Sequence, residues 1–421
     1  MTFESFFAAQ EFFLWSVFGI ALLLGALVNK TNFCTMGAVS DWVNMGDTGR
    51  FRAWLLAIAV ALLGVTVLES GGMVNVDASF PPYRAGQLIW AENLFGGLLF
   101  GIGMTLASGC GNKCLVRIGG GNLKSIMVFL VIAVIAYFMI NPFPGSDQTL
   151  FTVLFYDWIR PLAVDVGPAQ DLGTLVAGSD NAAMARLVIG GVLGLVLLVV
   201  VFRSADFRSS FDNVLGGLVV GLAVLGAWYV TSNAMVDADG EVYSLQAYAQ
   251  QWDFLAESDE GKPADTRPLA SQSFTFINPM GQMVGYSTSG FQHAYLTFGV
   301  MAVFGVVLGS LLWSLLSRSF RFEWFASLKD FANHLIGAIL MGFGGVLALG
   351  CTIGQGITGI STLALGSFIA FGGIVLGSAL TMKIQYYKLV YEDEASFMAA
   401  LVTSLVDLHL LPSGLRRLDA V

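Results

Sequence analysis

Two thiols and three cations lie together in one glycine-rich stretch of this chain. Cys110 and Cys114 stand four residues apart, and Lys113, Arg117 and Lys124 lie among the neighbouring glycines. Backbone N–H groups in glycine-rich turns can bind an anion without a fixed charge. A thiol is a weak hydrogen-bond donor and a polarizable partner for soft atoms. These residue types therefore allow either anion binding or thiol chemistry.

The residues that lead up to Cys110 are repeated in a second stretch of the chain, which leads up to Cys351. When residues 96–110 are shifted by 241 positions, 8 of 15 residues match, and both copies end in Gly-Cys after an apolar run. The matching residues of the first copy are Gly96, Leu99, Gly101, Gly103, Leu106, Ala107, Gly109 and Cys110. A lone cysteine in an apolar run is usually an inert small hydrophobe, but the repeated position favours a functional role for Cys110 and Cys351.

Two fainter copies extend the pattern. Asn32-Phe33-Cys34-Thr35-Met36-Gly37 resembles Cys351-Thr352-Ile353-Gly354, and Gly216–Gly221 parallels Gly96–Gly101. Carried forward, the last copy places Val230 where a cysteine is expected. We therefore predict four polar loops, three of which carry a thiol. Cys114 has no counterpart, because the matching position is Gln355, and it is expected to be a structural residue.

The elements that position these loops are membrane helices. Of 421 residues, 56% are hydrophobic and 12% charged, whereas soluble domains have about 25% charged residues. A net charge of -9 gives no indication of nucleic-acid binding. Apolar runs of spanning length predict nine helices, at 12–28, 52–69, 92–109, 123–140, 187–203, 214–231, 294–316, 334–350 and 364–382.

The distribution of lysine and arginine predicts the orientation of the chain. With the N-terminus outside, 15 of the 20 basic residues fall in inside segments and 5 in outside segments. The positive-inside rule thus favours an N-terminus outside and a C-terminus inside. The five outside residues are Arg84, Arg160, Arg186, Lys262 and Arg267.

This orientation gives the two strong copies opposite directions. The Cys110 loop follows a helix that runs inward, and the Cys351 loop follows one that runs outward. Inverted repeats with broken helices are a transporter architecture with its site near the midplane. We therefore expect an all-α polytopic membrane protein in which four re-entrant loops meet at the centre.

The predicted organisation has two repeat halves and three extramembrane parts. Residues 1–140 form the first half, 141–186 an external loop, and 187–421 the second half with a cytoplasmic tail at 383–421. The second half contains an external insertion at 232–292. This insertion carries eight carboxylates, and we expect it to be a solvated cap that permeation does not need; they are Asp237, Asp239, Glu241, Asp253, Glu257, Asp259, Glu260 and Asp265.

Three of these motifs resemble the YeeE/YedE family of sulfur-transport membrane proteins. They are Asn32–Gly37, Gly109–Gly121 and Gly350–Gly359, which read Asn-Phe-Cys-Thr-Met-Gly, Gly-Cys-Gly-Asn-Lys-Cys-Leu-Val-Arg-Ile-Gly-Gly-Gly and Gly-Cys-Thr-Ile-Gly-Gln-Gly-Ile-Thr-Gly. The resemblance covers most of the hydrophobic chain but not the two long outer segments. It implies thiosulfate uptake across a bacterial inner membrane through a central path lined by Cys34, Cys110 and Cys351.

The implied substrate fits these residue types. Thiosulfate is a dianion, and its terminal sulfur is soft, so neutral thiols can hold it loosely at successive sites, as conduction requires. The supporting residues of the path are predicted to be Asn32, Gly109, Gly111, Asn112, Lys113, Arg117, Gly350, Thr352 and Gln355. We expect contact with the lipid bilayer, no cofactor and no metal. Family context adds a small TusA-like cytoplasmic sulfur carrier as a partner.

Three alternatives stay open at this point. The cargo could be another sulfur or selenium species, with the same fold. The chain could be a membrane thiol oxidoreductase that uses Cys110 and Cys114, although redox motifs favour Cys-x-x-Cys over the Cys-x-x-x-Cys found here. Finally, a cysteine could become persulfidated and transfer sulfur to a carrier.

Overall fold

Nine long apolar helices dominate the described part of the chain. The computed structural model describes residues 1–238, 240–252, 268–392 and 395–419. Over these residues, nine helical segments are long and apolar enough to cross a membrane, so the prediction of an all-α polytopic membrane protein is confirmed. Their helices are α1 (Phe6–Thr31), α3 (Gly49–Ser70), α4 (Trp90–Leu106), α6 (Leu123–Ile140), α9 (Ala182–Phe202), α11 (Phe211–Asn233), α15 (Phe298–Leu316), α16 (Leu328–Leu347) and α17 (Leu365–Val390).

Polar residues just before the apolar runs set several helix starts. Ser5 accepts a hydrogen bond from the Ala8 N–H, Asn122 from Ser125 and Thr297 from Val300. Such caps satisfy N–H groups that have no partner within the helix. The chain therefore stops and restarts its helices at defined residues, which fixes the length of the turns between them.

Shorter elements fill the interior and the ends. Four of them begin inside the helix bundle: α2 (Thr35–Ser40), α5 (Gly111–Gly119), α14 (Ile277–Thr288) and the π-helical η5 (Gly354–Gly359). The remaining elements are η1 (Asp41–Met45), η2 (Thr152–Tyr156), α7 (Asp157–Ile159), η3 (Arg160–Leu162), α8 (Leu172–Ala177), α10 (Ala205–Ser209), α12 (Leu245–Gln250), η4 (His293–Tyr295), α18 (Phe397–Asp407), η7 (Ser413–Leu415), and the strands β1 (Thr2–Phe3), β2 (Gln87–Leu88), β3 (Val164–Asp165), β4 (Met235–Ala238) and β5 (Glu241–Ser244).

Helix contacts occur in matched pairs between the first and second parts of the chain. The contact between α1 and α15 corresponds to the contact between α11 and α3. In the same way, the contact between α4 and α17 corresponds to the contact between α16 and α6. α1 also packs on α11, and α4 on α16. These eight helices thus exchange partners as a two-fold relation requires, whereas α9, which packs on α3, has no equivalent among these contacts.

Glycines at the α4–α16 contact show the same relation at residue level. A Cβ added to Gly103 would lie 2.6 Å from the Gly337 carbonyl oxygen, and one added to Gly337 would lie 2.6 Å from that of Gly103. Gly96 and Gly344 face each other in the same way. Since the shift of 241 relates Gly96 to Gly337 and Gly103 to Gly344, each contact is the image of the other. Small residues allow this close approach of membrane helices.

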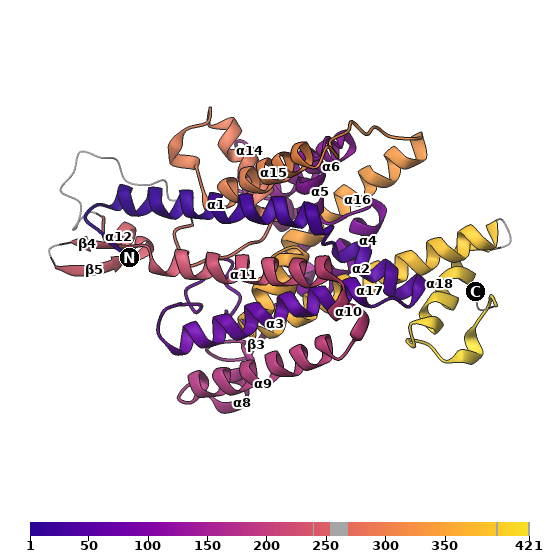
Figure 1. Ribbon diagram of the computed structural model, residues 1–421, viewed down its shortest axis with the longest axis horizontal. Helices are drawn as coiled ribbons and strands as arrows, with labels where there is room; N and C mark the ends of the chain where they lie inside the picture. The colour runs from indigo at the N-terminus through magenta and orange to yellow at the C-terminus, as the bar shows by residue number, and fades with distance from the viewer. Residues whose placement is uncertain (239, 253–267, 393–394, 420–421) are drawn as a thin grey trace.

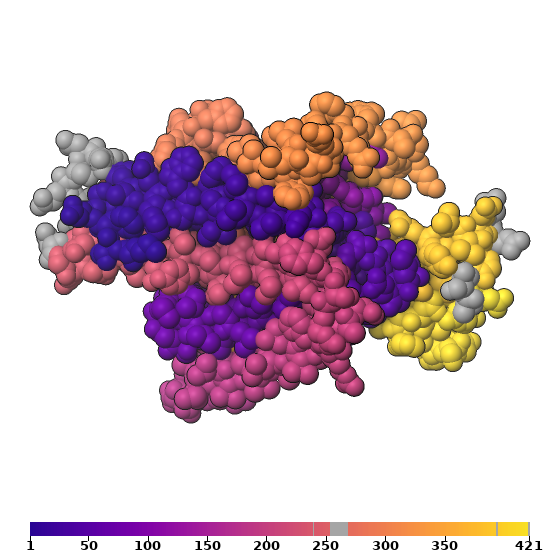
Figure 2. Space-filling view, viewed as in Figure 1, coloured from indigo at the N-terminus to yellow at the C-terminus, as the bar shows by residue number. Residues whose placement is uncertain are grey.

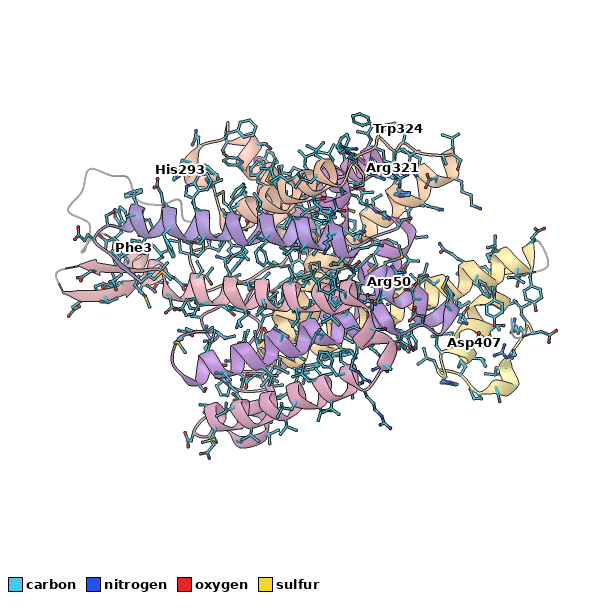
Figure 3. All side chains as sticks on the ribbon, viewed as in Figure 1. Phe3, Arg50, His293, Arg321, Trp324 and Asp407 are labelled. Atoms are coloured by element: carbon cyan, nitrogen blue, oxygen red, sulfur yellow. The ribbon has the colours of Figure 1, made fainter. Side chains whose placement is uncertain are left out.

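The two termini lie at opposite ends of the long axis (Figure 1). Phe3 and His293 are near one end, and Arg321, Trp324 and Asp407 are toward the other (Figure 3). At the N-terminal end, β1 pairs in parallel with β4, and β4 pairs with β5, so the first residues are tied to the end of α11. The C-terminal segment around α18 forms a projection at the opposite end (Figure 2).

Two predicted boundaries are wrong. The helix expected at 364–382 continues to Val390, so the tail predicted at 383–421 begins within α17. The expectation that 232–292 is one solvated cap fails for its second part, because Phe274, Phe276 and Met280 are completely buried. All eight of its carboxylates precede this part in the sequence, and six of them lie outside the described residues: Asp239, Asp253, Glu257, Asp259, Glu260 and Asp265.

Candidate functional site

Cys110 and Cys351 lie at equivalent turns that end α4 and α16. Ser108 and Leu349, two residues earlier, both have left-handed backbone conformations with φ 57°. In each turn the N–H of the next residue, Gly109 or Gly350, donates to a carbonyl five residues back at 2.8 Å. The shift of 241 thus relates not only residue types but also backbone geometry, and it leaves each thiol just ahead of a new helix.

The three predicted thiols each precede a short helix inside the protein. Cys34 precedes α2, Cys110 precedes α5, and Cys351 precedes the helical turn 352–361, where the Gly354 N–H lies 3.4 Å from its Sγ. Their exposed fractions are 6%, 3% and 0%. Cys110 lies near both other thiols, close enough that a negative charge on either of them would act on it. The structure therefore brings together three residues separated by more than 300 positions.

The fourth short helix is not where the repeat placed it. The prediction that Val230 occupies the fourth loop is wrong, because α11 continues through this residue to Asn233. Instead α14 begins inside the protein, just after Thr275 and Phe276. A Cβ added to Gly350 would lie 3.3 Å from Thr275 Oγ1, and one added to Gly111 would lie 3.0 Å from Ile277 Cδ1. The start of α14 therefore contacts the helix starts that follow Cys110 and Cys351.

We call these four starts the central arms: residues 32–40, 109–119, 274–288 and 350–361. Thr275 is the functional candidate that the sequence analysis missed. The available signal was the apolar run Phe274–Met280 inside a polar segment, with Gly281 and Gly285 spaced for close packing on a neighbouring helix.

Each central arm contains a buried polar atom without a nitrogen or oxygen hydrogen-bond partner. Among the described residues these include the hydroxyls of Thr35, Thr275 and Thr352 and the amide oxygens of Asn112 and Gln355. The hydroxyl of Thr275 lies beside the Cys351 thiol, and that of Thr352 beside the Cys110 thiol. A buried polar group left without a partner costs about 1–3 kcal/mol. Five such groups around three thiols therefore mark a site for a polar ligand or for water, and not an apolar core.

Two cations of α5 lie beyond the thiols. The Lys113 side chain is 9% exposed, and its ammonium donates to Asn32 Oδ1. Lys113, Asn32 and Arg117 line a cavity of about 290 Å³. The other predicted supporting residues, Gly109, Gly111, Asn112, Gly350, Thr352 and Gln355, lie in the turns and first residues of the two arms related by the shift. Cys114 is buried one turn further along α5.

Comparison with known proteins gives the family. The family model described as sulphur transport matches residues 30–380, which include all three thiols and all four central arms. The chain belongs to the sulphur-transport family. The resemblance to YeeE/YedE proteins is thereby confirmed.

Two relatives in this family have names that state a substrate. The chain is 24% identical to the thiosulfate transporter TsuA of Escherichia coli K12 over 379 residues, covering 84% of this chain and 90% of the relative. It is 22% identical to the thiosulfate transporter TsuA of Spirochaeta thermophila over 375 residues, covering 87% and 97%. Both relatives are named as transporters and not as enzymes, which supports the prediction of a transporter.

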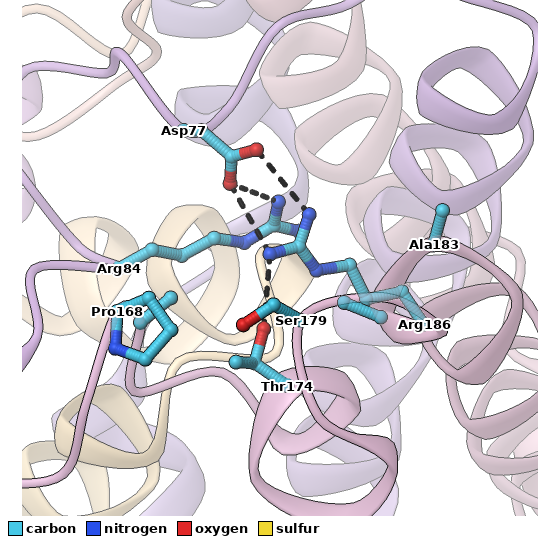
Figure 4. A pocket seen from close by; sticks show the side chains of 9 residues that line it. Asp77, Arg84, Pro168, Thr174, Ser179, Ala183 and Arg186 are labelled. Atoms are coloured by element: carbon cyan, nitrogen blue, oxygen red, sulfur yellow. Dashed lines mark hydrogen bonds and ion pairs between the residues drawn. The ribbon is translucent and has the colours of Figure 1, made fainter.

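A buried ion-pair network outside the central arms is a further feature of this family member. Arg84 is almost fully buried and donates to the Thr362 carbonyl at 2.9 Å and to Glu69 and Asp77. Asp77 lies between the guanidinium groups of Arg84 and Arg186 (Figure 4). Asp77, Arg84 and Arg186 line a pocket of about 330 Å³. The network fixes the end of the Cys351 arm to the segment that follows α3.

Asp171 completes this network. It caps α8, accepts from Thr174, and pairs with Arg186 Nε at 2.8 Å. Burial raises its pKa, but the bonds to Arg186 and Thr174 outweigh burial and lower it to about 2. The pKa of Asp77 is also lowered, since its pairs with Arg84 and Arg186 outweigh burial. Three carboxylates around two arginines leave no positive charge here, so this pocket does not attract an anion.

Proposed function

We propose that this protein imports thiosulfate across the bacterial inner membrane. The observation that carries the proposal is the meeting of three buried thiols with four helix starts and five buried polar atoms that lack a nitrogen or oxygen partner. The two related thiosulfate transporters support the choice of substrate. A sulfur dianion uses both kinds of group at once, since its oxygens accept hydrogen bonds and its terminal sulfur is soft.

In this proposal the central arms are re-entrant and form a serial path. Cys34, Cys110 and Cys351 contact the terminal sulfur in turn, while backbone N–H groups and the hydroxyls of Thr352 and Thr275 donate to the oxygens. Weak neutral donors at several successive positions allow the anion to enter and to leave. Asn32, Asn112, Lys113, Arg117 and Gln355 line the path beside the glycine turns at Gly109, Gly111 and Gly350.

The two halves act as inverted repeats in this mechanism. The matched contacts of α4 with α16 and of α1 with α11 support such a relation. With the N-terminus in the periplasm and the C-terminus in the cytoplasm, two arms approach from each side. A small TusA-like sulfur carrier is our proposed cytoplasmic partner, because transported sulfur needs an acceptor.

Uptake by purified protein tests the substrate. Proteoliposomes should accumulate radiolabelled thiosulfate, and unlabelled thiosulfate should compete better than sulfate or selenite. Sulfate lacks the soft sulfur and tests the role assigned to the thiols. Accumulation of selenite or sulfate at a rate equal to that of thiosulfate would replace the proposed substrate with another oxyanion.

A further inference from the structure

The cavity beside α5 has an unbalanced positive charge. Three cations, Lys113, Arg117 and Arg321, line it together with a single carboxylate, Glu323, which leaves a formal charge of +2. Its other polar lining residues are neutral amides and hydroxyls: Asn29, Asn32, Asn122, Ser314 and Ser319. This charge is opposite and equal to that of a sulfur oxyanion dianion.

The carboxylate does not neutralise the two inner cations. Glu323 accepts from the Asn122 amide at 2.6 Å and lies 3.8 Å from the exposed Arg321. Among the ion pairs of the described residues, neither Lys113 nor Arg117 has a carboxylate partner. A buried cation without a paired charge is costly to maintain. Lys113, at 9% exposure, is such a cation; its side chain lines the cavity, and its backbone N–H lies beside the Cys110 thiol.

The charge is present in only one of the two equivalent arms. The shift of 241 relates Lys113 to Gly354 and Arg117 to Thr358, so the arm that follows Cys351 has no cation at either position. Backbone geometry is shared between these arms, whereas this charge is not. The cations therefore do not belong to the common helix packing, and they distinguish one side of the central arms from the other.

We propose that this cavity is a second oxyanion site, in which Lys113 and Arg117 hold the sulfonate end of the anion after it leaves the thiols. The inference rests on the proposed function for its direction, since the cavity lies on the side of the C-terminus. In this structure the Lys113 ammonium donates to Asn32. When the anion arrives, the ammonium exchanges Asn32 for a sulfonate oxygen, and Arg117 supplies the second donor.

A cysteine reporter in the cavity tests the site without depending on transport. Ser319→Cys places a thiol on the exposed lining, and Ala326→Cys places one on the same loop outside the cavity. Both are made in a Cys114→Ala background and treated in inside-out vesicles with two methanethiosulfonates, one bearing a sulfonate and one a trimethylammonium. We expect the sulfonate reagent to be favoured about tenfold at Ser319→Cys relative to Ala326→Cys, through local attraction of the anion.

Removal of either cation should weaken this preference. Arg117→Gln and Lys113→Gln should each reduce it several-fold, while Lys329→Gln, which removes an exposed cation of the same side outside the cavity, should leave it unchanged. Arg117→Gln carries the test alone if Lys113→Gln does not fold. A preference that survives both substitutions, or that is equal at the two reporters, would overturn the proposal.

Competition by inorganic sulfate distinguishes a bound anion from long-range attraction. Millimolar sodium sulfate should slow labelling of Ser319→Cys by a neutral maleimide more than sodium chloride at equal ionic strength, and Arg117→Gln should remove the difference. Equal effects of the two salts would show only long-range electrostatic attraction of anions and would overturn the proposal of a binding site. Thiosulfate uptake is measured in parallel, so a protein that binds sulfate here without transporting thiosulfate refutes the proposed function alone.

Discussion

At the scale of single residues, the thiols differ in ways that spacing alone does not show. Cys110 and Cys114 are four residues apart and both buried, but only Cys110 occupies a helix start shared with the second half of the chain. Cys34 and Cys351 occupy helix starts in the same way. Position in the central arms, and not proximity in sequence, therefore groups three of the four cysteines.

Alanine at Cys34, Cys110 or Cys351 should reduce thiosulfate uptake by about tenfold or more, because each removes one contact from a serial path. Serine at these three positions should also reduce uptake, since its oxygen is less polarizable than sulfur. Cys114→Ala should retain most activity. Initial uptake rates at matched membrane abundance measure this. A thiol oxidoreductase would show the opposite grouping, with Cys110 and Cys114 failing together and Cys351→Ala active.

Thr275→Val should separate activity from stability. The hydroxyl is buried with only the Cys351 thiol, a weak hydrogen-bonding group, beside it, so replacing it with a methyl group should leave the thermal unfolding temperature nearly unchanged or raise it. Uptake should fall about fivefold or more, because one donor to the anion is lost. Thr275→Ser is the matched control and should keep activity. Full uptake by Thr275→Val would remove Thr275 from the path.

Residue-level prediction succeeded where the two halves share residue types. Cys110 and Cys351 could be paired because the eight identities preserve the glycines that the α4–α16 contact requires. Thr275 could not be found this way, because 43 residues separate the end of α11 from the start of α14, so the arm does not follow the helix directly. Because a long insertion separates this helix from its arm, the spacing found in the other copies does not predict where the arm begins.

At the scale of elements, the segment 232–292 combines two parts with different roles. The acidic residues make the average composition of the segment polar, so composition alone does not predict α14. The first residues of α14 are buried against α6 and α15. By contrast, each of the nine membrane helices was predictable, because continuous apolar runs of this length have one common explanation. Helix ends were less accurate: α1 starts six residues before the expected run and α17 ends eight residues after it.

Replacement of parts of this segment should give opposite results. A short polar linker in place of residues 254–266 should leave uptake measurable, whereas one in place of residues 272–290 should abolish it, because it removes α14 and Thr275. Uptake and membrane abundance are measured together for both variants. Normal transport without residues 272–290 would show that three arms are sufficient.

At the scale of the whole molecule, the ion-pair network makes the free energy of unfolding depend on pH. Asp171 has a pKa of about 2 in the folded protein and about 4 when unfolded. A lowered carboxyl pKa stabilises the fold above the unfolded value, and this stability is lost as the pH falls toward 2. After allowance for solvent screening, Asp171 contributes on the order of 1 kcal/mol.

Thermal unfolding of detergent-solubilised protein should therefore show a decline between pH 4 and pH 2 that Asp171→Asn reduces. The variant should be less stable than the parent at pH 7 and differ less from it at pH 2. Asp180→Asn, which changes an exposed carboxylate near the network, is the control. Parallel pH curves for parent and Asp171→Asn would contradict this assignment.

The orientation of the molecule is also testable. Reporter fusions should place residue 1 in the periplasm and residue 421 in the cytoplasm, as the count of 15 basic residues against 5 indicates. The two ends already lie at opposite ends of the long axis (Figure 1). A cytoplasmic signal from the N-terminal fusion would reverse the direction assigned to the cavity beside α5.

The exchange of helix partners between the halves has a consequence for synthesis on the ribosome. α1 ends at Thr31, but its partners α11 and α15 end only at Asn233 and Leu316. The partners of α4, which are α16 and α17, are likewise synthesised much later than α4 itself. During this interval the two arms of the first half contact α3 and α6 but lack their partners α17 and α15 of the second half, although exposed polar backbone is unstable in lipid. The insertion machinery must therefore shelter the first half until the second arrives, and a prematurely terminated chain becomes a substrate for membrane proteases.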